Sequence, residues 1–289
     1  SMAEDIGELW EGQAIVKRLA TAYGTAQEAI ELGTSCGWEA PTEAADLAAA
    51  ASAAGGGASL AYGELLPRGF TAALGQLGAW ELEGGTLLDL GSGTGKLALQ
   101  AFLELGPSGR LRRALGVELA PSRHALGAAA LRRLAEAHPE AYALAEGDEA
   151  DADATVVLEL RAGASGPASP RRVELRRGDF LGALPRALLG EADIVLLQVC
   201  LPPAVYPQLF DLLGCLRPGT RILSLLDLTQ AWDGIWGDED GIGADSAGCP
   251  VAYEGGSREL GERLLPTSWC LKGWPFLAFV AQGCATPPP

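Results

Sequence analysis

Short apolar runs alternate with helix-type spacing over most of the chain beyond residue 85. The runs that predict buried strands lie at 86–90, 113–119, 173–180, 193–200 and 221–228. Apolar residues with a period near 3.6 lie between them, at 96–105, 121–138 and 205–216. This repeated order of strand and helix predicts an α/β fold with a doubly wound, mostly parallel sheet.

The remaining segments depart from that alternation. Residues 1–80 have helical spacing and predict an N-terminal helical cap, followed by a ligand-binding domain over 81–289. Residues 146–172 combine an acidic run, the strand-like TVVLELRA and a Gly/Ser/Pro stretch, which indicates an inserted β-hairpin. Residues 229–262 are rich in glycine and acidic residues and predict a long functional loop. Residues 265–282 predict a C-terminal antiparallel hairpin that turns near Lys272–Gly273.

Composition narrows the class of protein. The 289 residues are 48% hydrophobic, which is enough for a packed core, and we expect no membrane span because no apolar run reaches ~18–20 residues. The net charge of −16 makes nucleic acid an improbable direct ligand and favours a basic protein or peptide as partner. Six cysteines without a CxxC pair indicate buried, reduced thiols, no metal site and an intracellular location, with nucleus and cytoplasm both open. The oligomeric state stays open.

A glycine-rich turn follows the first predicted strand. Asp89 closes the strand, and Gly91, Ser92, Gly93 and Gly95 lead into the next helix. Such a turn exposes backbone N–H groups at the carboxyl edge of the sheet, and the missing β-carbons let a ligand approach the backbone. A tight turn without a ligand is the alternative, since many folds share the pattern.

Acidic residues close the next two strands as well. Glu118 can accept both hydroxyls of a ribose, and Asp179 can accept from an adenine amino group while Phe180 packs on the base. Asp89 would repel a diphosphate but suits an ammonium group. S-adenosylmethionine (SAM) has an ammonium, a ribose and an adenine and no phosphate, so the sequence predicts SAM rather than NAD. Each acid taken alone could be a solvated strand end.

Several motifs together resemble a known family. They are YGEL (62–65), LLDLGSGTGK (87–96), GVEL (116–119), RGDF (177–180), RPGTRILS (217–224) and TSW (267–269). In this order they resemble the disruptor-of-telomeric-silencing family, the non-SET histone lysine methyltransferases. The resemblance covers about residues 60–228 and 266–282, and it implies the Rossmann-like fold of class I methyltransferases.

The resemblance also implies roles for individual residues. The YGE segment would cover the methionine end of SAM, and the catalytic residues would be Tyr62, Glu64, Gln198 and Trp269. Gln198 stands where the family carries an amide, Lys96 stands where it usually has glutamine, and Trp269 would line the lysine channel. The implied cofactor-binding set is Glu64, Asp89, Gly91, Ser92, Gly93, Gly95, Lys96, Glu118, Leu119, Gly178, Asp179, Phe180 and Gln198.

The leading hypothesis is a SAM-dependent methyltransferase that modifies a protein lysine, with histones among the candidate substrates. Two alternatives stay open: a small-molecule methyltransferase covered by the N-terminal helices, and a SAM-binding protein without turnover. Two structural alternatives stay open as well. Tyr62 and Glu64 could cap a helix that begins near Pro67, and Trp269 and Trp274 could be core or interface aromatics.

Overall fold

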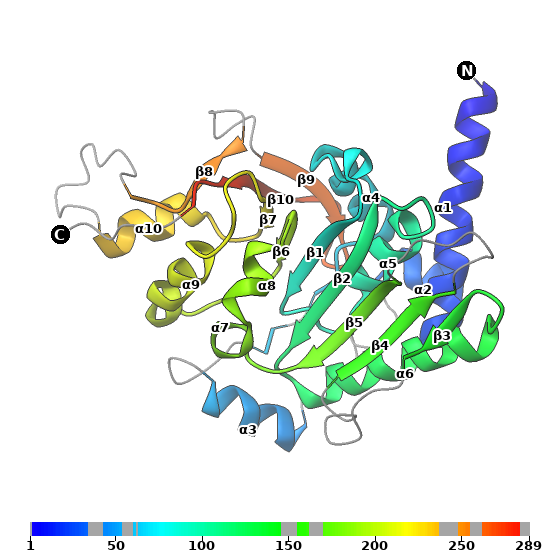
Figure 1. Ribbon diagram of the computed structural model, residues 1–289, viewed down its shortest axis with the longest axis horizontal. Helices are drawn as coiled ribbons and strands as arrows, with labels where there is room; N and C mark the ends of the chain where they lie inside the picture. Colours follow the sequence, from blue (N-terminus) through cyan, green and yellow to red (C-terminus); the bar gives the residue numbers. More distant parts are fainter. Residues whose placement is uncertain are drawn as a thin grey trace.

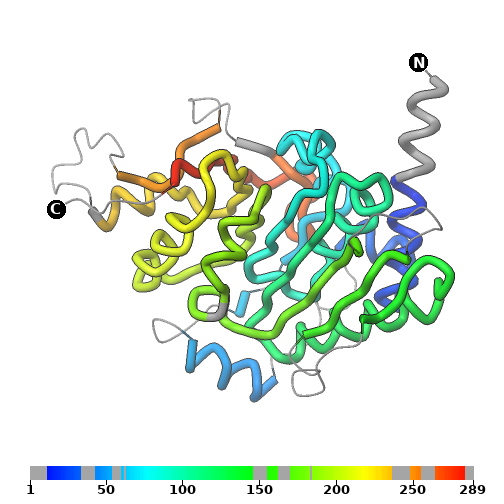
Figure 2. Tube along the Cα trace, in the orientation of Figure 1, coloured from blue at the N-terminus to red at the C-terminus, as the bar shows by residue number. Residues whose placement is uncertain are grey.

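The computed structural model describes residues 2–33, 43–53, 60–61, 63–145, 155–161, 170–236, 248–254 and 262–283 (Figure 2). The helices are α1 Met2–Tyr23, α2 Gln27–Glu31, α3 Ala44–Ser52, α4 Pro67–Gln76, η1 Ala79–Glu81, α5 Lys96–Leu105, α6 Pro121–Ala137, α7 Phe180–Ala183, α8 Arg186–Gly190, η2 Pro203–Val205, α9 Tyr206–Leu213 and α10 Leu228–Trp236. The strands are β1 Gly85–Leu90, β2 Leu111–Glu118, β3 Tyr142–Leu144, β4 Thr155–Leu160, β5 Arg171–Arg177, β6 Ile194–Leu197, β7 Arg221–Ser224, β8 Val251–Tyr253, β9 Glu262–Thr267 and β10 Cys270–Ala281.

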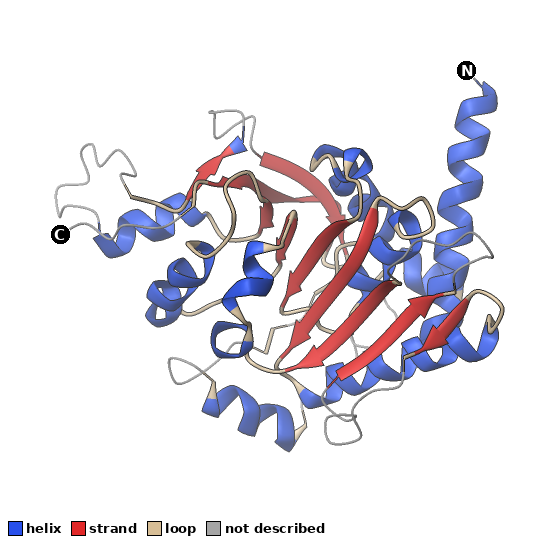
Figure 3. Ribbon diagram, viewed as in Figure 1, coloured by secondary structure: helices blue, strands red, loops and turns tan. Residues whose placement is uncertain are grey.

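One sheet contains the strands of the described residues (Figure 3). Its order is β3-β4-β5-β2-β1-β6-β7-β10-β8, with β9 paired to β10. The central strands from β5 to β7 are parallel, and β10 runs antiparallel to both β7 and β8. A doubly wound sheet with parallel central strands and antiparallel strands toward its edges is a Rossmann-like arrangement, so the predicted fold class is confirmed.

Helices cover both faces of the central strands (Figure 1). Side chains of α1, α4, α5 and α6 form one apolar core with one face of the sheet, and side chains of α8, α9 and α10 form a second core with the other face. The strand β1 lies between these cores, and all six of its residues are buried. A parallel strand covered on both faces needs a continuous apolar run, which explains the TLLDL signature.

The insertion and the long loop differ in how well the sequence predicted them. The predicted hairpin is confirmed: β4 pairs antiparallel with β5, although its tip lies outside the described residues. The short strand β3 was not predicted. The prediction of a long loop at 229–262 is wrong in part, because it contains most of α10 and all of β8. Ala231 and Trp232 pack in the second core, a helical pattern that the surrounding glycine and acidic residues obscured.

The C-terminal hairpin turns earlier than predicted. The turn lies at Ser268–Trp269, and β10 continues through Lys272–Gly273. Thr267 Oγ1 accepts a hydrogen bond from Cys270 N–H at 3.1 Å and closes the turn. Gly273 has a φ of 112° and lies where the register shifts, so this glycine marks an irregularity within a strand and not its end.

The cysteines are less buried than predicted. Strand β6 ends at Leu197, so Cys200 lies beyond it and is exposed, whereas Cys249 is buried. The four cysteines in the described segments are free thiols. In the same segments, no helix has the length and apolar character needed to cross a membrane.

A buried carboxylate ties β5 to β2. Glu174 is 2% exposed and forms ion pairs with Arg113 at 2.6 Å, Arg172 at 2.6 Å and Arg176 at 3.1 Å. Burial alone would raise the pKa of Glu174, but the hydrogen bond and charge of Arg113, with the charges of Arg172 and Arg176, lower it overall. The ionised carboxylate therefore stabilises the fold above the pKa that it has in the unfolded chain.

Glu174→Ala should lower the free energy of unfolding at pH 7 by about 3 kcal/mol, since it leaves buried guanidinium groups without their partner. The difference from wild type should shrink as the pH falls below about 4, because the carboxyl of the unfolded chain then becomes protonated while the folded carboxylate, with its lowered pKa, is still ionised. Urea denaturation at both pH values measures this. Glu159→Ala, on the neighbouring strand, is the control and should stay within about 0.5 kcal/mol of wild type; equal losses for both variants would contradict the assignment.

Candidate cofactor pocket

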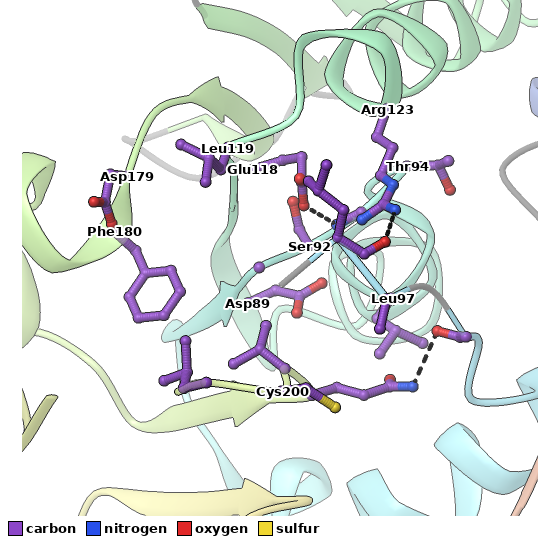
Figure 4. A pocket seen from close by; sticks show the side chains of 18 of the residues that line it. Asp89, Ser92, Thr94, Leu97, Glu118, Leu119, Arg123, Asp179, Phe180 and Cys200 are labelled. Atoms are coloured by element: carbon purple, nitrogen blue, oxygen red, sulfur yellow. Dashed lines mark hydrogen bonds between the residues drawn. The ribbon is translucent and has the colours of Figure 1, made fainter. Parts of the chain in front are cut away.

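A pocket opens at the carboxyl ends of β1, β2 and β6 and beside the start of α7 (Figure 4). In a doubly wound sheet, ligands bind at this edge. Eleven of the predicted site residues line it: Glu64, Asp89, Gly91, Ser92, Gly93, Lys96, Glu118, Leu119, Asp179, Phe180 and Gln198. They come from five separate stretches of the chain, which the fold brings together.

The turn after β1 requires glycine for conformational reasons. Gly91, Gly93 and Gly95 have φ values of 79°, 57° and 75°, where a side chain is strained. A β-carbon on Gly91 would also lie 2.1 Å from Val199 Cγ1. Of the predicted glycines, Gly95 and Gly178 do not line the pocket: Gly95 precedes α5 and packs against Leu175, and Gly178 donates its N–H to Glu118 O at 2.9 Å.

Asp89 is a buried acid at the centre of the pocket lining. It is 1% exposed, and its Oδ2 has no hydrogen-bond partner among the described residues. Burial, together with the nearby charge of Glu118, raises the pKa of Asp89 to about 7, although a hydrogen bond from Ala98 N–H acts in the opposite direction. A solvated strand end would show neither feature, so Asp89 is placed to meet a cationic group.

Glu118 is also buried, but backbone groups hold it in place. Its Oε2 accepts from Gly93 N–H at 2.7 Å and its Oε1 accepts from Ala120 N–H at 2.7 Å. Burial raises the pKa of Glu118 in spite of these two bonds. Each carboxylate oxygen keeps a further lone pair, so the residue can still accept hydrogen bonds from a ligand.

Asp179 and Phe180 lie on the far side of the pocket from Arg123 (Figure 4). Asp179 Oδ1 accepts from Leu181 N–H at 3.0 Å and caps α7, so this acid has a structural function whatever it binds. The ring of Phe180 is 8% exposed and forms part of the pocket lining.

The described residues of the YGEL motif, 63–65, form with Leu66 a strap, residues 63–66, along one side of the pocket. Glu64 makes a buried ion pair with Lys96, and Gly63 O accepts from Gln198 Nε2 at 3.2 Å. The N-cap of α4 is Leu66 and has no side-chain capping bond, so Glu64 does not cap that helix. Tyr62 lies outside the described residues.

The strap is also fixed to the C-terminal hairpin. Glu64 O accepts from Ser268 N–H at 2.8 Å, and Leu66 N–H donates to Pro266 O at 2.9 Å. Trp269 does not line the pocket; its ring lies against Gly63, where a β-carbon would be 2.3 Å from Cζ3. Trp269 is 37% exposed and Trp274 is 45% exposed, so neither is a core aromatic.

Sequence reasoning missed two features of the pocket. Arg123 lines it and donates to Leu60 O. Asp46 on α3 accepts from the N–H and the hydroxyl of Ser122, at 3.0 and 2.6 Å, and so fixes α3 to the start of α6. Both features depend on the Pro-Ser-Arg sequence that opens α6, which was their signal in the sequence. Ser122 contacts Asp46 of α3, and Arg123 contacts Leu60.

Comparison with known proteins shows similarity in fold only. No protein-family profile matches the chain, and no curated protein does. Among solved structures, a SAM-dependent O-methyltransferase from Thermotoga maritima aligns over 78% of this chain and 69% of its own, with 12% identity and a TM-score of 0.42. The B. subtilis M1A22 tRNA methyltransferase TrmK aligns over 73% and 65%, with 14% identity and a TM-score of 0.39. A putative SAM-dependent methyltransferase from Streptococcus mutans aligns over 73% and 48%, with 16% identity and a TM-score of 0.41.

These neighbours are methyltransferases by description, two of them described as SAM-dependent, but identities and TM-scores this low transfer neither a substrate nor an activity. The chain spans less than two thirds of two of them. What the pocket binds therefore has to be argued from its own residues.

The buried carboxyl of Asp89 should give a pH-dependent stability. A carboxyl whose pKa is raised to about 7 by folding destabilises the fold as the pH rises from about 4 to 7, because the unfolded chain releases this proton in that range while the folded state still holds it. Asp89→Asn removes this cost, so its melting temperature should exceed that of wild type by several degrees at pH 8 and by much less at pH 5. Thermal unfolding of both proteins without ligand measures the difference; the same gap at both pH values would show that the pKa of Asp89 is not raised.

Proposed function

We propose that the pocket binds SAM and that the protein is a methyltransferase. The observation on which this rests is Asp89: an acid that is 1% exposed and has an oxygen without a partner among the described residues, beside a turn with three glycines at positive φ. Burial without a partner costs stability, and a cationic ligand would offset that cost. The α-ammonium of SAM supplies such a cation.

The other residues fit the remaining parts of the same molecule. Glu118 would accept from the ribose hydroxyls, and Asp179 with Phe180 would hold the adenine, one by hydrogen bonding and the other by packing. Pyrophosphate fits poorly, because Asp89 and Glu118 place two carboxylates on the lining beside the turn. When bound, SAM supplies an activated methyl group, so this chain's residues need only position a nucleophile and exclude water.

The acceptor that we propose is a lysine of a basic protein. The support is the resemblance in the YGE and TSW motifs, whose described residues the fold brings into contact, together with the net charge of −16. An aromatic pair next to the strap suits the alkyl stem and the methylated ammonium of a lysine. Gln198 follows strand β6, and its side chain donates a hydrogen bond to Gly63 O in the strap. At this position it would help to orient the acceptor lysine.

Titration calorimetry with SAM should detect one site, and Asp89→Asn should weaken binding by at least about tenfold through loss of a charge-assisted hydrogen bond. Wild-type affinity should rise between pH 6 and pH 8 as Asp89 loses its proton, whereas the affinity of the variant should not. Glu159→Ala is the control. Absence of SAM binding by the wild type at millimolar concentration would refute the proposed function.

Incubation with methyl-tritiated SAM should label lysines in core histones or in other basic proteins, with the modified residue identified by mass spectrometry. Glu64→Gln should lower transfer more than it lowers SAM affinity, because it breaks the buried ion pair with Lys96 that fixes the strap. Label found only on small molecules would reject lysine as the acceptor and leave the methyltransferase assignment intact.

A further inference from the structure

A second pocket lies on the other side of the chain segment 198–206. It is lined by Pro203 and Tyr206, by Leu225 and Leu226 after β7, and by residues of α10. Trp274, Pro275 and Leu277 of β10 complete it. Like the cofactor pocket, it adjoins the carboxyl end of a parallel strand, which is the edge where this class of fold binds ligands.

Two connections join the second pocket to the first. Residues Gln198–Pro202 and Val205 line the cofactor pocket, whereas Pro203 and Tyr206 line the second, so a single segment separates them. The strap is the other connection: Gly63 lines the cofactor pocket and contacts Trp269, whose ring meets Trp274 edge-on with centroids 6.3 Å apart. Trp274 lines the second pocket.

The chemistry of the second pocket is largely apolar. Its polar side chains are Tyr206, Asp227 and Gln230. Asp227 accepts from Thr229 Oγ1 at 2.9 Å and from Gln230 N–H at 3.1 Å and so stabilises the first turn of α10. The apolar character continues onto the surface: Leu264, which pairs with Pro275 across the two strands, is 69% exposed, and Trp274 is 45% exposed. An apolar pocket with exposed aromatic and aliphatic neighbours is typical of a surface that binds a polypeptide.

We infer that the second pocket holds an apolar side chain next to the target lysine of a polypeptide acceptor. This rests on the proposed function and adds a recognition rule to it. Exposed apolar side chains, Trp274 and Leu264, adjoin the pocket, and the net charge of −16 attracts a basic segment. With its apolar side chain anchored against Trp274, the segment would pass Trp269 and bring its lysine to the strap beside the cofactor pocket.

Gly234 allows the pocket to be filled without disturbing the fold. It lies on α10 and lines the pocket, and a β-carbon there would meet no heavy atom within 4 Å. Gly234→Leu should therefore fold and occupy the space of the anchor. Gly190→Leu is the matched control, because Gly190 is also a helical glycine with open space around it, and it lines neither pocket.

The experiment uses methyl-tritiated SAM and a peptide library with one central lysine, in which each flanking position is varied in turn. Wild type and Gly190→Leu should prefer Phe, Leu or Trp over Ala at one flanking position by about tenfold in kcat/KM. Gly234→Leu should lose that preference while its Kd for SAM stays within about twofold of wild type. Trp274→Ala, which removes one wall instead of filling the space, should weaken the same preference.

The outcomes separate the two proposals. Methylation of the library without an apolar preference, or a preference that survives in Gly234→Leu, would overturn the second pocket as the anchor site and leave the methyltransferase in place. SAM binding without methylation of any peptide would overturn the polypeptide acceptor and the anchor together. Failure to bind SAM at all would remove the proposed function on which both depend.

Discussion

The rest of the site depends on one buried carboxylate, which lies near the end of the central strand β1. Asp89 lies on β1 between β2 and β6, with helices over both faces, so water does not reach it. The chain must then leave the strand through a turn that adds no bulk, which is why Gly91 has a positive φ and meets Val199 directly. Burial of the ionised carboxylate lowers the stability of the fold. The same burial strengthens the electrostatic attraction between the carboxylate and a cationic ligand.

Strand order decides which groups share this environment. Because β2 is the parallel neighbour of β1, its terminal Glu118 falls beside the turn and adds a second negative charge near Asp89. Backbone N–H groups of Gly93 and Ala120 partly relieve that repulsion. On the other side, β6 brings Gln198 to the strap. Each contact follows from sheet topology and needs no local sequence signal.

This explains which parts the sequence predicted. Apolar runs in the sequence indicate where the strands end, and Asp89, Glu118 and Asp179 stand at or just after those ends. Because parallel strands end at one edge of the sheet, it was predictable that these acids would line one pocket. The Lys96–Glu64 pair, 32 positions apart, was not, because it depends on how the strap folds back. The start of β10 was missed because Gly273 signals a break that the sheet absorbs as a register shift. Helix α10 was missed because its apolar residues stand among glycine and acidic neighbours.

The strap makes the two pockets parts of one mechanical unit. Within four residues, Gly63 accepts from Gln198 and contacts Trp269, Glu64 pairs with Lys96, and Leu65 bridges to Thr267. Gln198 and Lys96 line the cofactor pocket, whereas Trp269 and Thr267 belong to the C-terminal hairpin, so the strap cannot move relative to the cofactor pocket without also moving relative to the hairpin. Packed elements shift between discrete arrangements and do not deform smoothly. The strap therefore links the position of the cofactor pocket to that of the aromatic pair Trp269 and Trp274.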